Sequence, residues 1–123
     1  MNRRILPIYT TVGDVGGFLY YPYIFSPTGE WIGWVTEDRE VYSTLGMYVG
    51  WLSDDPRVLR KRSYDFSQPR REPPSPPPKL RVPARVPLAP LMPELTQTII
   101  DVLYEEPYRL TTADYDELRE DMR

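Results

Sequence analysis

Residues 29–52 read GEWIGWVTEDREVYSTLGMYVGWL, a stretch that begins and ends on nearly the same heptapeptide, GEWIGWV and GMYVGWL. The similarity extends to both sides, so that residues 25–35 align with residues 42–52 at a spacing of 17. The segment IYTTVGDVGGFL, residues 8–19, is a third copy displaced by 16 residues, and VLRKRSYDF, residues 58–66, begins a fourth copy without its glycines. A period this short indicates a repeated supersecondary unit.

Each copy has the composition of a β-hairpin. An aromatic or aliphatic pair leads into a four-residue turn that ends in glycine (TTVG, SPTG and STLG), and a strand rich in aromatic and aliphatic residues follows. In SPTG the proline suits a type I turn, and Gly29 suits the left-handed position after it. Within the outgoing strand, alternation places Trp31 and Val35 on one face and Ile32 and Trp34 on the other.

Three glycines recur inside the outgoing strands, at positions 17, 33 and 50. Because glycine weakens a strand, its recurrence predicts the close approach of a neighbouring ring or backbone. A unit of 16 or 17 residues is too short to bury its own face, so the copies are expected to close around a shared centre. The alternative is a meander of ordinary hairpins that share only their turn chemistry.

The two heptapeptides, each of which follows an aromatic residue and a turn, resemble the short Gly-x-aromatic-aliphatic-Gly-Trp motif of a small bacterial domain called the 4-fold beta flower. The resemblance covers about the first 60 to 66 residues. It implies an all-β fold in which hairpins surround an axis, and it implies no activity and no site. We therefore expect residues 1–66 to form a small radial or barrel-like array of 16–17-residue β-hairpin repeats.

Composition changes sharply after this domain. Ten of the 15 prolines lie in residues 69–93, which predicts an extended proline-rich arm over residues 67–93. The first part, residues 69–79, is polar and is expected to be a solvated spacer. The second part is expected to lie in a groove on the chain's own hairpins or on a second subunit, because it carries apolar residues among its prolines: Leu80, Val82, Val86, Leu88, Leu91 and Met92.

The acidic tail, residues 94–123, is predicted to be partly helical. A first helix is expected to begin near Glu94, although the run TIIDVL has no clean period and also suits a strand. A second helix is predicted after Thr111 or Thr112, either of which can cap it.

The chain has no cysteine and no histidine. These absences exclude the common nucleophile–histidine and zinc sites, and there is no phosphate-loop or dinucleotide motif, so we expect no enzymatic activity, no catalytic residue, no cofactor and no metal. Carboxylates are the remaining candidates for acid–base chemistry or a Ca²⁺ or Mg²⁺ site, with solvated turns as the alternative: Glu37, Asp38, Asp54 and Asp55. No stretch resembles a signal peptide or membrane span, so a soluble cytoplasmic protein is expected.

Charge is arranged in blocks. The net charge is −4 over residues 1–56, +7 over residues 57–85 and −6 over residues 86–123. A basic block between acidic ends can attract nucleic acid, or it can contact the acidic tail as a charge belt. The basic residues that suit a single-stranded nucleic acid lie close to the rings of Tyr64 and Phe66, and they are Arg57, Arg60, Lys61, Arg62, Arg70 and Arg71.

The leading interpretation is a non-enzymatic protein-interaction or assembly module that binds a protein partner or a second copy of itself. Weak nucleic-acid binding through residues 57–71 is the alternative. In LYYPY, the residues Tyr20, Tyr21 and Tyr23 are expected to form a binding face at the connection between two copies. The arm, with Leu88 and Leu91, is the type of segment that aromatic grooves accept.

Overall fold

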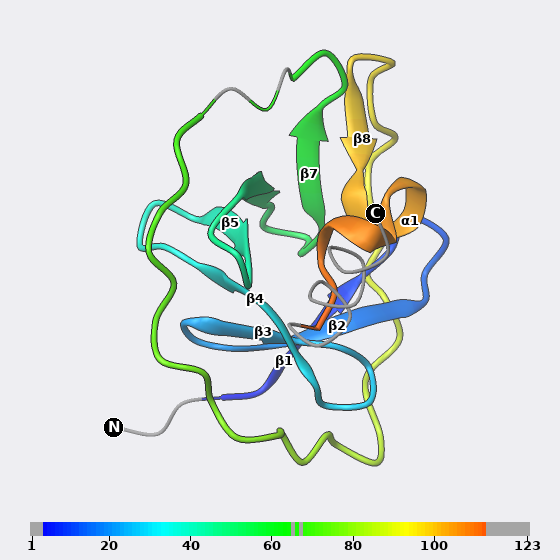
Figure 1. Cartoon of the computed structure of the whole chain (residues 1–123). Helices are drawn as coiled ribbons and strands as arrows, with labels where there is room; N and C mark the ends of the chain where they lie inside the picture. Colours follow the sequence, from blue (N-terminus) through cyan, green and yellow to red (C-terminus); the bar gives the residue numbers. More distant parts are fainter. Residues whose placement is uncertain (1–3, 65, 67, 113–123) are drawn as a thin grey trace.

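The computed structural model of the chain describes residues 4–64, 66 and 68–112. It is mostly β: eight antiparallel strands form one curled sheet, and each strand pairs with its neighbours in the sequence (Figure 1). The strands are β1 (Leu6–Tyr9), β2 (Val15–Tyr20), β3 (Tyr23–Phe25), β4 (Trp31–Val35), β5 (Glu40–Ser43), β6 (Tyr48–Leu52), β7 (Val58–Lys61) and β8 (Ile99–Asp101). The prediction of a β-sheet protein is confirmed.

The first three hairpins share one irregularity, which corrects the predicted strand faces. The register shifts by one residue between Ile8 and Tyr9 in β1, between Ile24 and Phe25 in β3, and at the corresponding position of β5. In β4 the extra residue is Ile32, which enters the same apolar core as Val35. The expected alternation of Ile32 and Val35 is therefore wrong, because a β-bulge re-aims the side chains that follow it.

The inner face of the curled sheet carries the core. Seven of the eight strands supply at least one buried aliphatic residue to it, and the segment after β8 adds two more; the cluster comprises Ile8, Ile24, Ile32, Val35, Val41, Val49, Leu52, Val58, Ile100, Val102 and Leu110. A Cβ atom at Gly17, Gly33 or Gly50 would lie 2.7, 2.6 or 2.1 Å from a backbone carbonyl oxygen of the adjacent strand. The predicted close approach at these three glycines is confirmed.

The sheet does not end with residue 66, because β8 comes from the segment that was expected to be a helical tail. β8 pairs with β7 in the register Leu59 to Asp101. The helix predicted near Glu94 is wrong: the only α-helix of the described residues, α1 (Val102–Glu105), begins after β8, where the side chain of Asp101 accepts a hydrogen bond from the backbone of Tyr104. A 3₁₀ turn, η1 (Pro107–Arg109), follows. The second predicted helix lies outside the described residues beyond Thr112.

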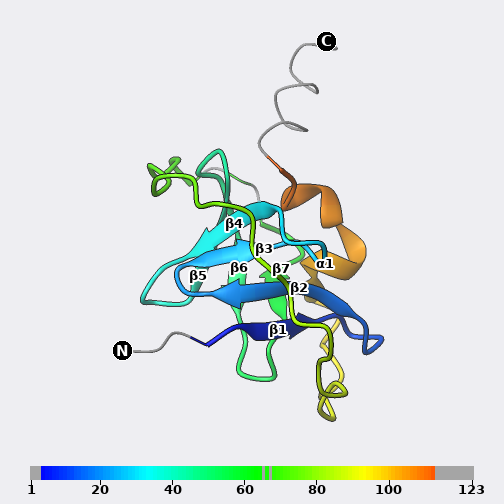
Figure 2. The same ribbon diagram turned by 90° about the horizontal axis from the view of Figure 1, so that it is seen from below.

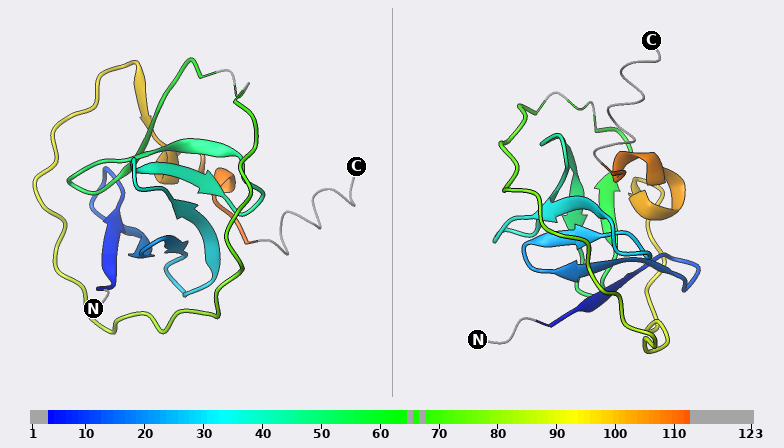
Figure 3. Two further views of the ribbon diagram at one scale, coloured as in Figure 1. Left: turned by 90° about the vertical axis from the view of Figure 1, so that its left-hand side faces the viewer. Right: turned by 60° about the horizontal axis from the view of Figure 1, so that its bottom comes forward.

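Residues 62–98 join β7 to β8 and contain no helix or strand among the residues that the structure describes. This segment includes the predicted arm, and Figure 3 shows that it runs in a wide arc around the outside of the sheet before it returns to β8. The arm is therefore a long insertion within the last strand pair, because strands on both sides of it belong to one sheet.

Candidate functional site

The arm is attached to two hairpin turns through its backbone. The N–H of Arg71 donates to the carbonyl of Gly46, and the N–H of Leu80 donates to the carbonyl of Gly29, each at 2.9 Å. Both glycines are buried. A Cβ atom at Gly46 would lie 2.0 Å from the Arg71 carbonyl oxygen, and one at Gly29 would lie 2.2 Å from the Leu80 carbonyl oxygen. The corresponding glycine of the first hairpin, Gly13, is exposed and has open space around it.

Aromatic side chains on the outer face of the sheet receive the first part of the arm. Trp34 and Tyr42 stack with ring centroids 4.8 Å apart, and the guanidinium of Arg71 lies 5.9 and 5.3 Å from these two centroids. Such a cation above aromatic faces is attracted by their quadrupoles. The Tyr23 hydroxyl donates to the Ser75 carbonyl at 2.9 Å. The spacer predicted for residues 69–79 is thus wrong in one respect, because its backbone is held on the sheet.

A cavity of about 430 Å³ lies where the arm passes over the sheet. Its lining comes from the connection after β2, from β4 and the turn after it, and from the arm, and consists of Tyr21, Pro22, Trp34, Val35, Thr36, Glu37, Asp38, Arg71, Glu72 and Pro74. We call the sheet's share of this surface the arm groove: the lining residues other than Arg71, Glu72 and Pro74, together with the arm's contacts Tyr23, Gly29, Tyr42 and Gly46. Two of the candidate binding residues, Tyr21 and Arg71, meet in the cavity. Tyr23, two residues after Tyr21, contacts the arm through its hydrogen bond to Ser75. Tyr20 is a half-buried residue at the end of β2.

Ion pairs add to the backbone contacts. Lys79 lies 3.2 Å from Glu30 in the second hairpin, and Arg71 lies 3.6 Å from Glu40 at the start of β5. The pKa of Glu30 is lowered, first because the Thr28 hydroxyl donates a hydrogen bond to its carboxylate and then because Lys79 does so. These pairs are exposed, so they orient the arm more than they stabilise it.

The later part of the arm is held at two further carbonyls. The hydroxyl of Tyr9, which is buried in β1, donates to Pro87 at 2.7 Å. The guanidinium of Arg57 donates to Pro93 at 3.1 Å. The arm therefore contacts the third hairpin, the second hairpin, β1 and Arg57, the residue before β7, in turn as it circles the sheet (Figure 2).

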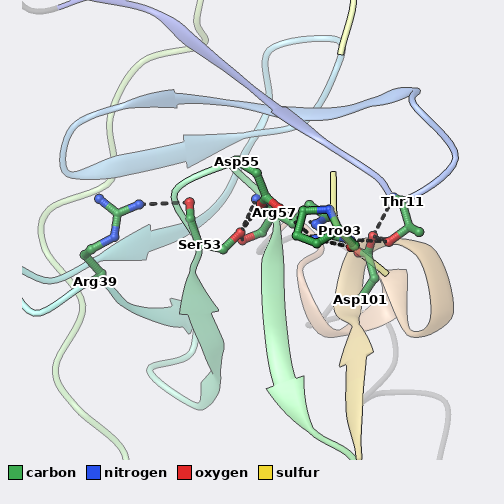
Figure 4. Close-up of polar contacts among 7 residues, drawn as sticks. All are labelled: Thr11, Arg39, Ser53, Asp55, Arg57, Pro93 and Asp101. Carbon is green, nitrogen blue, oxygen red and sulfur yellow. Dashed lines mark hydrogen bonds and ion pairs between the residues drawn. The ribbon is translucent and has the colours of Figure 1, made fainter. Parts of the chain in front are cut away.

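Arg57 is the buried centre of a partly buried polar cluster, shown in Figure 4. It is 1% exposed and donates to both carboxylate oxygens of Asp55, to the Thr11 hydroxyl at 3.2 Å and to Pro93. The Thr11 backbone and hydroxyl both donate to Asp101 at 2.7 Å. The cluster thus joins the turn after β1, the start of β7, the end of β8 and the arm.

The same cluster lowers one carboxyl pKa. Burial alone would raise the pKa of Asp55, but hydrogen bonds from Arg57 and Ser53 outweigh that effect, so its pKa lies below the usual value of 3.8. A charged guanidinium buried with its carboxylate is costly to disrupt, because either group alone would remain desolvated and unpaired. Arg57 is therefore part of the internal framework and does not present its charge to a phosphate.

The other basic candidates divide into paired and exposed residues. Arg60 is buried, lies 2.8 Å from Glu106 and sits over the Phe66 ring at 4.6 Å. Arg62 lies 3.4 Å from Glu105. The predicted charge belt that contacts the acidic tail is confirmed for these two pairs. Lys61 and Arg70 are exposed.

The charge belt changes the pKa of Glu106. Its pKa is lowered, mainly because Arg60 donates a hydrogen bond to its carboxylate, with Arg109 contributing as well.

Of the four acidic candidates, Glu37 and Asp38 line the arm groove, Asp55 holds Arg57, and Asp54 is exposed 3.6 Å from Arg39. Among the described residues, no three carboxylates gather as a metal ion would require.

Two features of this site are not predicted from the sequence. The first is the pairing of arm N–H groups with turn glycines; a usable signal exists in the nine-residue spacing of Pro69-Arg70-Arg71 and Pro78-Lys79-Leu80, since Arg71 and Leu80 occupy the same position in the two triplets. The second is the exposure of the arm's leucines. Leu88 and Leu91 project into solvent, whereas Leu80, Val82, Val86 and Met92 are half-buried as expected.

Comparison of the chain with protein-family models, curated proteins and solved structures gives no match. In the part of the chain that the structure describes, no helix is both long enough and apolar enough to cross a membrane.

Proposed function

We propose that the protein is a non-enzymatic interaction module whose arm groove binds extended, proline-rich polypeptide, with its own arm as the resident ligand. The observation that carries the proposal is the docking of residues 71–80 on two turn glycines and an aromatic surface. Proline-rich segments are suited to such sites because they are extended before they bind and lose little conformational entropy.

The proposal includes a repeat architecture for the sheet. Four hairpins, β1–β2, β3–β4, β5–β6 and β7–β8, form the array that the 16–17-residue period and the resemblance to the 4-fold beta flower suggest. The fourth hairpin is open at its turn, and the arm is inserted there. Equivalent turns on neighbouring hairpins would then supply equivalent acceptors, which supports the use of both Gly29 and Gly46 by one extended chain.

An intramolecular ligand sets the conditions under which a partner binds. A tethered segment has an effective concentration in the millimolar range, so a partner peptide must displace the arm before it can occupy the groove. The expected behaviour is weak binding by the complete protein and stronger binding when the arm is released.

The experiment uses a full-length variant whose arm cannot dock. Arg71→Pro with Leu80→Pro removes both N–H donors and the guanidinium over the rings, and proline suits the extended arm. A fluorescent peptide of residues 68–84 is added, and binding is followed by anisotropy. We expect the peptide to bind the variant roughly 10- to 100-fold more tightly than the wild-type protein.

The matched control is the same peptide with proline at both positions, which should not bind either protein. Equal and unmeasurable binding of the wild-type peptide to both proteins would overturn the proposal. Circular dichroism of the variant must retain the β signal, because the proposal concerns a released arm and not an unfolded sheet.

A further inference from the structure

The segment between Pro87 and Pro93 is presented as a fixed loop. Tyr9 holds the carbonyl at its beginning and Arg57 holds the carbonyl at its end, and Figure 2 shows this part of the chain projecting beside β1. Two apolar side chains on the loop are unsupported: Leu88 is 95% exposed and Leu91 is 102% exposed. Leucines held in this way cost free energy in water, and their prolines limit the entropy that binding would remove.

An apolar cavity of about 450 Å³ lies directly beside this loop. Most of its lining is aliphatic or proline, from β1, β2, the end of β6, the turn before β7 and the loop itself: Leu6, Pro7, Ile8, Leu19, Leu52, Pro56, Pro87, Leu88 and Pro90, with Tyr9, Arg39 and Asp54 completing it. Its apolar lining suits an apolar group. Leu91 is the next residue in the chain after Pro90, which lines the cavity.

The rim of the cavity carries one charge of each sign. Arg39 and Asp54 lie 3.6 Å apart, and their side chains are 49% and 103% exposed. A surface that has a protruding apolar residue, an apolar cavity and both charges is complementary to itself. Self-complementarity is the property of an interface related by a two-fold axis, in which each contact occurs twice.

We propose that this face forms a two-fold symmetric dimer, in which Leu91 of each copy enters the cavity of the other and Arg39 of each copy meets Asp54 of the other. The surface is separate from the arm groove, so the proposal stands independently of peptide binding there. An unrelated protein with an apolar cleft would engage the same leucines, but it would not require the opposite charges on this chain's own rim.

The first test is sedimentation of the full chain from low micromolar concentrations to roughly 1 mM, the weak end of specific association. We expect a monomer–dimer equilibrium, and Leu91→Asp should raise its dissociation constant about 100-fold or more, because two leucine burials are lost at once. Tyr104→Asp is the matched control, since Tyr104 is 55% exposed on α1, away from the cavity; it should leave the dissociation constant unchanged.

The second test identifies the occupant as a second copy. Arg39→Glu and Asp54→Lys each place like charges together across the proposed axis, so each variant alone should dimerise more weakly than the wild type. Mixing the two variants restores an opposite pair at both contacts, and a heterodimer should form, detectable by native mass spectrometry.

A monomeric wild-type protein at all concentrations would overturn the proposal. So would a dimer that Leu91→Asp leaves intact, or variants that fail to prefer each other on mixing. Because Arg39 also donates to the carbonyls of Leu52 and Ser53, thermal unfolding of each variant is measured in parallel, and Leu91→Asp remains decisive if Arg39→Glu does not fold. Peptide binding to the released groove, measured as above, is expected to survive Leu91→Asp.

Discussion

Gly29→Ala is expected to detach the arm locally without unfolding the sheet. The new Cβ would lie 2.2 Å from the Leu80 carbonyl oxygen, so the arm must move and lose the hydrogen bond from Leu80 to Gly29. A hydrogen bond of this type contributes about 0.5–1.5 kcal/mol. The left-handed conformation of residue 29 adds about 1–2 kcal/mol of strain for any residue with a side chain.

The first hairpin offers a matched control for the strain. Gly13 has φ +93° against +95° at Gly29, and it occupies the same place in the turn, but a Cβ atom there meets nothing within 4 Å. Gly13→Ala should therefore carry the strain without the arm contact. The difference between the two variants isolates the docking of the arm.

Hydrogen exchange measured by NMR gives the local readout. A loss of about 1.4 kcal/mol corresponds to a tenfold loss of protection, so the Leu80 amide should exchange roughly tenfold faster in Gly29→Ala and at the wild-type rate in Gly13→Ala. Trypsin should also cut more readily after Lys79 and Arg81 in Gly29→Ala. Equal protection of the Leu80 amide in all three proteins would refute the proposed docking.

Three further predictions concern the sheet and its buried charges. Arg57→Ala should destabilise the protein by about 3–5 kcal/mol, measured by urea unfolding, because it leaves buried polar partners unpaired; a loss below about 1 kcal/mol would contradict a buried pair, since that is the range of exposed ones. Gly33→Ala should cost about 1–3 kcal/mol, because its Cβ would lie 2.6 Å from the Tyr42 carbonyl oxygen, and an unchanged melting temperature would count against that packing. Because the folded state lowers the pKa of Glu106, the ionised carboxylate stabilises the fold at pH values above its usual pKa of 4.5, and this stability is lost as the pH falls through the folded-state pKa. Glu106→Gln should therefore lose less stability than the wild type between neutral pH and acid, whereas parallel pH profiles would exclude a contribution from its pair with Arg60.

The sequence predicts the hairpins because their causes are local. Turn glycines and aromatic strand residues act within a few positions, and the hairpins β3–β4 and β5–β6 form around the predicted turns SPTG and STLG. The bulge is less visible, since it arises from the pairing of two strands. Alternation alone therefore misplaces Ile32 relative to Val35.

The eighth strand and the path of the arm depend on contacts between distant residues. Ile99 and Ile100 suit either a helix or a strand by composition, and the free edge of β7 decides between them. The burial of two basic residues also depends on distant contacts, because Arg57 and Arg60 are bound to partners 36 and 46 positions away in the chain. Charge counts cannot distinguish a buried arginine from an exposed one such as Arg70.

The central claim, that the arm is bound to the turns of its own sheet, is tested most directly by scalar couplings across hydrogen bonds in the NMR spectrum of the full chain. Couplings from the Leu80 nitrogen to the Gly29 carbonyl carbon, and from the Arg71 nitrogen to the Gly46 carbonyl carbon, are expected at full intensity and should not change on dilution. If neither coupling is present while those of the β-strands are, the arm is not bound to these turns, and the proposed groove has no resident ligand.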